Sequence, residues 1–201
     1  MSADPAVVLE SLRAAIVGLR ADLRRNPGPA AQHSILVDPD HLLPVMRHLR
    51  DHCGFDLLTN LAGIDWPDPK LADAVAVPDD AGDAAVRAAG GFLEVVYHLD
   101  STKTRGAPLV LRARTADRSD QVSIPSVVGV FRSAEFQERE LFDLFGIHFT
   151  GHPDLRRILM WDAFEDHPMR KDYVAPDDYE YEPTPHGDVL EKARKHDPPK
   201  P

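Results

Sequence analysis

The sequence has very little of what cofactor-binding chains usually require. Only one of its 201 residues, Cys53, is a cysteine. A single thiol excludes an internal disulfide, and it excludes a zinc ribbon or iron–sulfur cluster held by cysteines of this chain alone. The sequence also lacks G-x-G-x-x-G and the Walker lysine loop, which are common phosphate-binding turns. We therefore do not expect this chain to bind a nucleotide.

Basic residues and long apolar runs are scarce as well. The chain has 23 Lys and Arg against 33 Asp and Glu, which gives a formal net charge of −10. This balance argues against binding to nucleic acid or to anionic lipid, because both need a basic surface. No run of 18 apolar residues occurs, so no transmembrane helix is expected, and charged residues interrupt any secretory signal at the N-terminus. We expect any membrane contact to come through another protein.

Hydrophobic periodicity predicts an α+β fold with a mainly antiparallel sheet packed with helices. An N-terminal amphipathic helix is expected over residues 9–23, where leucine and isoleucine recur every three or four positions. A second helix is expected from Asp40, as its N-cap, to about Asp51, with Pro44 in its first turn. Apolar segments predict strands at 34–37, 55–61, 92–99 and 109–115.

A third helix is expected at residues 134–145. Ser133 is its expected N-cap, and Gly146 follows it at the position that favours a left-handed residue. An extended stretch and then a short helix over residues 154–159 are expected beyond it.

The chain is expected to form one domain, residues 1–173, followed by a tail. A loop insert at about 66–91, rich in Ala, Asp, Gly and Pro, interrupts the domain and predicts one weak helical turn at 83–88. Residues 174–201 are acidic and rich in proline, a composition that cannot bury enough apolar surface to fold alone. We therefore expect an extended C-terminal segment that becomes ordered on a partner.

Charged, aromatic and turn-forming residues are densest in residues 138–173. Charges are costly to bury unless they are paired, so this density predicts either a pre-arranged polar network or a docking surface. Within it, Arg139 and Asp143 lie four positions apart on the expected helix and are expected to pair. Glu138 and Glu140 point to different helix faces, so they do not form a catalytic dyad.

Two histidines in this segment, His148 and His152, have the spacing of a helical metal site. Gly146, Gly151 and Pro153 argue against a helix there, so turn histidines bonded to backbone are favoured. A metal-dependent hydrolase stays open as a weak alternative.

Three motifs in the same segment carry a family resemblance. They are E-R-E-L-F-D-L-F-G-I at 138–147, G-H-P-D-L-R-R-I-L at 151–159 and H-P-M-R-K-D-Y at 167–173. On these residues the chain closely resembles the 30-kDa subunit of respiratory complex I, which in bacteria is the C subunit of NADH-quinone oxidoreductase. A looser resemblance extends upstream to about Phe55 and includes Asp65, in a G-x-D-aromatic element. Gln137 departs from the family pattern, which has an apolar residue there.

This resemblance implies a non-catalytic subunit in the peripheral arm of a proton-translocating complex, on the cytoplasmic side of the inner membrane. It implies no catalytic residue and no cofactor in this chain, while the whole complex uses FMN, iron–sulfur clusters and quinone. The implied partners are the 49-kDa-type subunit (in bacteria, the D subunit), near the quinone site, and neighbouring iron–sulfur subunits. The equivalent subunit of a membrane-bound hydrogenase-type complex is the alternative.

The resemblance also implies two sets of functional residues. An internal charge network is expected from Glu138, Arg139, Glu140 and Asp143, with Gly146 at the helix end. A partner-binding set is expected from ten further residues: His152, Pro153, Asp154, Arg156, Arg157, His167, Pro168, Arg170, Lys171 and Asp172.

Overall fold

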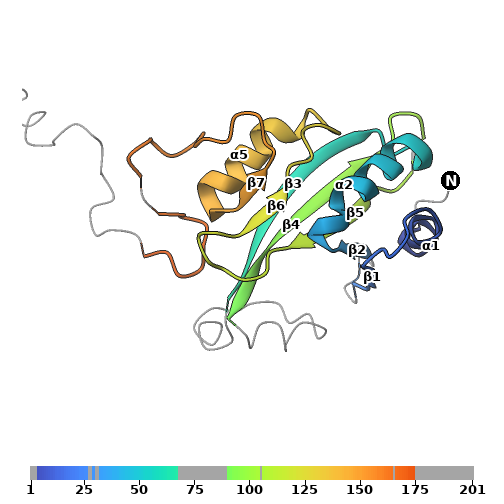
Figure 1. Cartoon of the computed structure of the whole chain (residues 1–201), viewed down its shortest axis with the longest axis horizontal. Helices are drawn as coiled ribbons and strands as arrows, with labels where there is room; N and C mark the ends of the chain where they lie inside the picture. The colour runs from blue at the N-terminus through green and yellow to red at the C-terminus, as the bar shows by residue number, and fades with distance from the viewer. Residues whose placement is uncertain are drawn as a thin grey trace, which may run out of the picture.

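The computed structural model describes residues 4–26, 29, 32–67, 90–104, 106–164 and 166–174. Its elements follow one another as α1 (Pro5–Ala15), β1 (Ala21–Arg24), β2 (Ser34–Val37), α2 (Pro39–His48), the π-helical turn η1 (Leu49–Cys53), β3 (Leu57–Pro67), β4 (Gly91–Asp100), β5 (Leu109–Arg114), β6 (Ser123–Pro125), α5 (Ala134–Phe145) and β7 (His148–Thr150) (Figure 1).

Within the described residues, five strands form the main sheet, in the order β1-β2-β5-β4-β3. Every neighbouring pair is antiparallel except β2 and β5, which run parallel. Strands β6 and β7 form a separate two-stranded parallel ribbon. The predicted α+β fold with a mainly antiparallel sheet is confirmed.

Helices α2 and α5 cover one face of the sheet (Figure 1). Leu42 and Met46 of α2 and Leu141 of α5 share one hydrophobic core with Leu93 and Tyr97 of β4. Burial of a side chain of this size stabilises the fold by about 1.5–3 kcal/mol, so this core is the main source of stability.

Helix α5 packs unusually close to β3, which is an edge strand of the sheet. A Cβ added to Gly63 of β3 would lie 2.6 Å from Cε2 of Phe145, so only glycine allows this approach. The helix also binds the outer edge of β3, where the N–H of Leu61 donates to Oε1 of Gln137 at 2.7 Å. Gln137, the departure from the family pattern, thus supplies an acceptor for one backbone N–H of this edge strand.

The predicted strands 34–37, 92–99 and 109–115 are confirmed to within a residue or two, and α5 has the predicted bounds. Gly146 ends α5 with a φ of 74°, as predicted. Ser133 is not a side-chain cap, because its hydroxyl donates to the carbonyl of Leu58 at 2.8 Å instead.

The prediction of one helix over residues 9–23 is wrong in its second half. Helix α1 ends at Ala15, Gly18 has a φ of 71°, and residues 21–24 form strand β1. Strand β1 pairs with β2, from Ala21 opposite Val37 to Arg24 opposite Ser34. Pairing with a distant strand outweighs the local helical spacing.

Two further boundaries differ from the predictions. Helix α2 begins at Pro39 with Asp38, not Asp40, as its N-cap, which places Pro44 inside the helix rather than in its first turn. Strand β3 continues to Pro67 instead of ending at Leu61.

The short helix predicted over 154–159 does not form: these residues adopt turns and irregular backbone. Most of the predicted insert, including the helical turn at 83–88, and the tail after Val174 lie outside the described residues. No helix in the described part of the chain is both long and apolar enough to cross a bilayer.

Candidate functional site

Most of the residues that the sequence indicates as functional lie where the chain leaves β7 and runs along α5. We call residues 151–164 and 166–174 the C-terminal segment. It contains no helix or strand, and it lies beside α5 (Figure 1). Its position therefore depends on side-chain contacts with the domain.

Asp143 of α5 holds the first half of this segment. Its buried carboxylate accepts a hydrogen bond from Nη1 of Arg157 at 2.7 Å. The other carboxylate oxygen accepts the N–H groups of Ile158, Leu159 and Met160 at 3.0, 2.7 and 2.8 Å. Burial by itself raises the pKa of Asp143, but the three N–H groups and Arg157 outweigh it and hold that pKa below its usual range. The carboxylate is thus the binding centre around which residues 157–160 fold.

Arg139, one turn earlier on α5, binds the same part of the segment through its carbonyls. Its buried guanidinium donates to the carbonyl oxygens of Arg156 at 3.1 Å and Arg157 at 3.0 Å. The predicted pair of Arg139 with Asp143 is therefore wrong, since each contacts the segment instead. Irregular backbone has no ladder partners, and these two side chains satisfy it.

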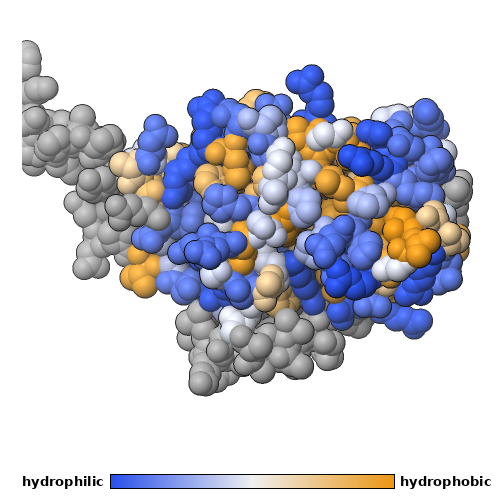
Figure 2. Space-filling view, viewed as in Figure 1, coloured by the Kyte–Doolittle hydropathy of each residue, from blue (hydrophilic) through white to orange (hydrophobic). Residues whose placement is uncertain are grey.

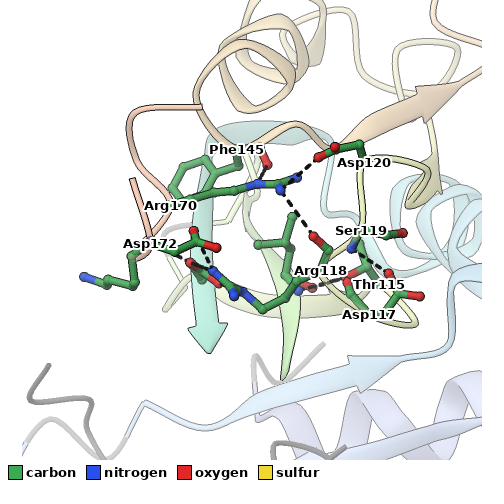
Figure 3. A network of polar contacts seen from close by, with 11 residues as sticks. Thr115, Asp117, Arg118, Ser119, Asp120, Phe145, Arg170 and Asp172 are labelled. Carbon is green, nitrogen blue, oxygen red and sulfur yellow. Dashed lines mark hydrogen bonds and ion pairs between the residues drawn. The ribbon is translucent and has the colours of Figure 1, made fainter. Parts of the chain in front are cut away.

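Asp65 of β3 holds the second half of the segment. Its buried carboxylate binds Arg118 with two hydrogen bonds of 2.6 and 2.7 Å, and it accepts the N–H of Lys171 at 2.7 Å. Arg118 also reaches Asp172 at 3.0 Å (Figure 3). Sequence reasoning singled out Asp65 but missed Arg118, which lies 53 positions away. No local pattern marks such a pair.

Arg170 fastens the segment to the end of α5. Its Nε donates to the carbonyl of Phe145 at 2.7 Å, and its Nη1 donates to the carbonyl of Arg118 and to Asp120 (Figure 3). A cation is well placed there, because the last carbonyls of a helix carry partial negative charge and lack helical partners.

Gly146 is required by the same arrangement. Besides its positive φ, a Cβ at this position would lie 2.5 Å from Nε2 of His167 and 2.7 Å from Nη2 of Arg170. The glycine both ends α5 and lets the segment approach the helix end.

The two histidines of the predicted partner-binding set contact backbone groups. Nε2 of His152 donates to the carbonyl of Glu135 at 2.9 Å, and its Nδ1 accepts the N–H of Asp154. Nδ1 of His167 donates to the carbonyl of Asp143 at 3.0 Å, and burial lowers the pKa of His167.

The histidine spacing considered for a metal site has no such geometry. His148 is exposed on β7, where its ring packs edge-on against Phe142, and His152 is engaged with backbone. Within the described residues, no three His, Cys, Asp or Glu side chains come together in a way that could hold a metal ion.

The expected charge network is not one network. Glu138 is fully buried and binds Ser126 and Val127, so it shares no partner with Asp143. Glu140 is exposed. Arg139 and Asp143 therefore act on the C-terminal segment, while Glu138 acts on a different loop.

The expected partner-binding residues divide by exposure. The side chains of Arg157 and Arg170 are only 15% and 12% exposed, and both bind within the chain. Arg156 and Asp154 are exposed and form an ion pair with each other at 2.9 Å. The members of the set that remain on the surface are Pro153, Asp154, Arg156, Lys171 and Asp172.

Large apolar side chains face outward along the segment and α5. Phe136 is 60% exposed, Leu159 is 58% exposed and Met169 is 53% exposed, and Ile158 and Trp161 are partly exposed. We call these five residues the apolar face. Figure 2 shows hydrophobic and hydrophilic residues interleaved on the side of the molecule that carries α5. The sequence places these side chains in a mixed segment, but it does not reveal that they point away from the core.

Known proteins are similar to this chain in sequence and in fold. The family model "Respiratory-chain NADH dehydrogenase, 30 Kd subunit" matches residues 35–179. The C subunit of NADH-quinone oxidoreductase from Roseiflexus sp. (strain RS-1) is 37% identical over 176 residues, which cover 86% of this chain and 85% of that protein. The protein named as copy 1 of the C subunit in Rhizobium etli (strain CIAT 652) is 38% identical over 136 residues, or 67% of this chain and 56% of that protein.

Another relative is a larger protein. The C/D subunit of NADH-quinone oxidoreductase from Bacteroides fragilis (strain YCH46) is 41% identical over 136 residues, which are 68% of this chain but 23% of that protein. The chain thus spans about half the length of the Rhizobium etli relative and about a quarter of this one.

Two solved structures have a similar fold. One, described as Nqo5 of a trypsin-resistant fragment, has a TM-score of 0.52 and 27% identity, and the match covers 75% of this chain and 98% of that one. A chain of the membrane-bound sulfane sulfur reductase, an archaeal respiratory membrane complex, has a TM-score of 0.59, and the match covers 98% of this chain and 95% of that one. At 21% identity the second likeness shows the fold alone.

The family model covers most of the chain, including every residue that holds the C-terminal segment, and the Roseiflexus relative matches along nearly its whole length. The chain therefore belongs to the family of the 30-kDa subunit of respiratory-chain NADH dehydrogenase and the C subunit of NADH-quinone oxidoreductase.

Proposed function

We propose that this chain is a non-catalytic peripheral-arm subunit of a proton-translocating NADH:quinone oxidoreductase, and that its apolar face docks on the 49-kDa-type subunit. One observation carries the docking proposal. The C-terminal segment turns its backbone toward Asp143, Arg139 and Asp65, and it turns large apolar side chains outward. Several large apolar side chains exposed along one short segment, with polar residues between them, favour a protein interface over an ordinary solvated surface.

We propose that the buried side chains of Arg157 and Arg170 do not contact the partner but hold the C-terminal segment in the shape that exposes the apolar face. Arg157 binds Asp143 and Arg170 binds the carbonyl of Phe145 at the end of α5, so both fix the shape of the segment before docking. A surface that is already ordered loses less conformational entropy on binding. The exposed Arg156 and Lys171 are then the cations available at the rim.

The name of the Bacteroides fragilis relative supports the 49-kDa-type subunit, the bacterial D subunit, as the partner. That protein is named with both letters, C/D, and this chain matches only 23% of it. Two domains in one chain are held at high effective concentration, which suits domains that work in contact. We propose the same contact here, formed between separate chains, with the iron–sulfur subunits as further neighbours and the quinone site nearby.

The remaining parts of the proposal follow from this placement. FMN, the iron–sulfur clusters and quinone would be held by other subunits, and the inner membrane would be reached from the cytoplasmic side only through the complex. Identity of 37–38% to curated NADH-quinone oxidoreductase proteins favours the NADH-driven complex over the hydrogenase-type alternative. The metal-dependent hydrolase has no supporting geometry in the described residues, because His148 and His152 are not brought to a shared site.

The test is affinity recovery of the tagged chain from gently solubilised membranes, with mass spectrometry of the proteins retained. We compare the wild type with a Leu159→Gln, Met169→Gln variant, which makes the apolar face polar. The control is Val7→Gln, Val17→Gln, because both valines are large, exposed and distant in sequence from that face. We expect the 49-kDa-type and iron–sulfur subunits with the wild type and the control, and a severalfold loss with the Leu159 and Met169 variant. Recovery of the wild type without the 49-kDa-type subunit would contradict the proposal.

A further inference from the structure

Glu138 differs from the other buried acids of the domain. The described residues contain four buried carboxylates. Three of them bind arginine: Asp65 with Arg118, Glu94 with Arg112 and Arg114, and Asp143 with Arg157. Glu138 binds no cation among the described residues. It accepts hydrogen bonds from the hydroxyl of Ser126 at 2.6 Å and the N–H of Val127 at 2.7 Å.

These two contacts connect α5 to the loop that precedes it. Ser126 and Val127 begin the 126–133 loop, which leads from β6 into α5, while Glu138 lies in the second turn of the helix. The N–H of Ser126 also donates to the carbonyl of Thr150. Glu138 therefore fixes the loop against the helix at the point where the loop leaves the two-stranded ribbon.

Tyr97 of β4 is the titratable group that faces Glu138. It is fully buried, and its hydroxyl has no hydrogen-bond partner in the described protein. Burial, and after it the charge of Glu138, raises the pKa of the Tyr97 phenol well above its ordinary value, so the phenol stays protonated. Because Tyr97 makes no hydrogen bond to the carboxylate, it does not compensate a charge on Glu138.

Charged side chains on the elements around Glu138 bind other partners or are exposed. From η1, Arg50 donates to the carbonyl of Val130 in the same loop, but its ion pair is with Asp51. On α5 itself, Arg139 binds the carbonyls of the C-terminal segment. On β3, Asp65 is bound to Arg118, and His148 of β7 is exposed.

The physical consequence is that the charged form of Glu138 is disfavoured. Burial raises the pKa of Glu138 to about 7, against the hydrogen bonds from Ser126 and Val127, which lower it. The neutral acid fits the same site, since it can donate to the oxygen of Ser126 while still accepting from Val127. The anion has no cation beside it, so contact with water stabilises it.

We propose that Glu138 is a proton-sensitive latch between α5 and the 126–133 loop. Its neutral form keeps the loop closed on the helix. Its ionised form favours local opening, in which the carboxylate leaves Ser126 and Val127 and becomes hydrated. This opening is a property of the folded domain and does not depend on the proposed contact with the 49-kDa-type subunit.

Hydrogen exchange of the purified full chain tests the latch. Exchange of amides in residues 126–133 is followed by mass spectrometry from about pH 5 to pH 8.5 and corrected for the intrinsic pH dependence of exchange. We expect opening in the wild type to increase by up to about tenfold per pH unit as pH rises toward 7, and to level off above pH 7, where Glu138 is ionised in both the closed and the open form. In Glu138→Gln the corrected rates should not change with pH.

Glu140→Gln is the matched control, because Glu140 is exposed on the same helix. It should keep the wild-type profile. A wild-type profile that does not change with pH, or one that Glu138→Gln leaves unaltered, would overturn the latch. Carboxyl NMR of the wild type needs no variant: a Glu138 resonance titrating near neutral pH supports the proposal, and one titrating near pH 4 contradicts it.

Discussion

Asp143 and Arg157 form a 2.7 Å ion pair that joins the last turns of α5 to the C-terminal segment. The same carboxylate binds three consecutive N–H groups beyond Arg157. One side chain thus gives a fixed shape to a stretch that has no secondary structure of its own.

Asp143→Asn should release this stretch. The amide keeps the size of the side chain but removes the charge, so Arg157 loses its carboxylate partner and the hydrogen bonds from the N–H groups of residues 158–160 are weakened. We expect a loss of about 3 kcal/mol in the free energy of unfolding, as for other buried ion pairs that lose one partner. Urea denaturation measures this loss, and limited proteolysis should show faster cleavage within residues 151–174. Glu140→Gln, on the exposed side of α5, should change stability by less than about 0.5 kcal/mol.

Gly146→Ala should weaken the packing of the C-terminal segment against the end of α5. The alanine must adopt a φ near 74° and its Cβ would collide with His167 and Arg170. The left-handed conformation alone costs about 1–2 kcal/mol, and displacement of Arg170 adds to this. Gly129→Ala is the control, because a Cβ there meets nothing within 4 Å and no positive φ is needed. Equal thermal unfolding temperatures for the two variants would refute the role assigned to Gly146.

Gln137→Leu should weaken the attachment of α5 to the edge of the sheet. The leucine would resemble the family pattern, yet it would leave the N–H of Leu61 without its acceptor. We expect a loss of about 1–2 kcal/mol in the free energy of unfolding, the usual effect of an orphaned partly buried donor. Gln121→Leu, at an exposed position, serves as the control. A gain in stability for Gln137→Leu would show that the contact with Leu61 contributes nothing.

Glu138 should make the stability of the domain fall as pH rises. The folded chain keeps this proton up to about pH 7, whereas the unfolded chain releases it near the ordinary value of 4.5. The folded state therefore binds more protons in this range, and its advantage is complete below pH 4.5 and lost as pH rises through 7. The full shift corresponds to at most about 3 kcal/mol. The unfolding free energy of the wild type should fall relative to that of Glu138→Gln across this window, and a difference between the two that is constant with pH would contradict the assignment.

Local sequence signals predicted some elements well and others poorly. Helix α5 was predictable because the signals for it are local: the apolar residues that it buries lie within the helix, and Gly146 follows directly at its end. The region of residues 16–24 was not, because the strand there exists only through pairing with residues 34–37. Helical spacing of leucines cannot reveal a partner strand about ten residues away.

The candidate site shows the same limit at the level of side chains. Residue spacing suggested that Arg139 pairs with Asp143, since four positions on a helix bring side chains together. In the structure both bind the backbone of the C-terminal segment, and spacing within a helix gives no information on contacts with residues outside it. The density of charged residues indicates the region, but tertiary contacts set the directions in which the side chains of Arg157, Arg170 and Leu159 point.

The most direct test of the docking face is cross-linking from Leu159 in intact membranes. A photoreactive amino acid replaces Leu159 on the apolar face, and a second version of the protein carries it at Val17 instead, which is fully exposed and distant in sequence. Mass spectrometry then identifies the cross-linked proteins. We expect a cross-link to the 49-kDa-type subunit from position 159 and none from position 17. Absence of that subunit from the products of position 159, with the complex intact, would contradict the proposed docking face.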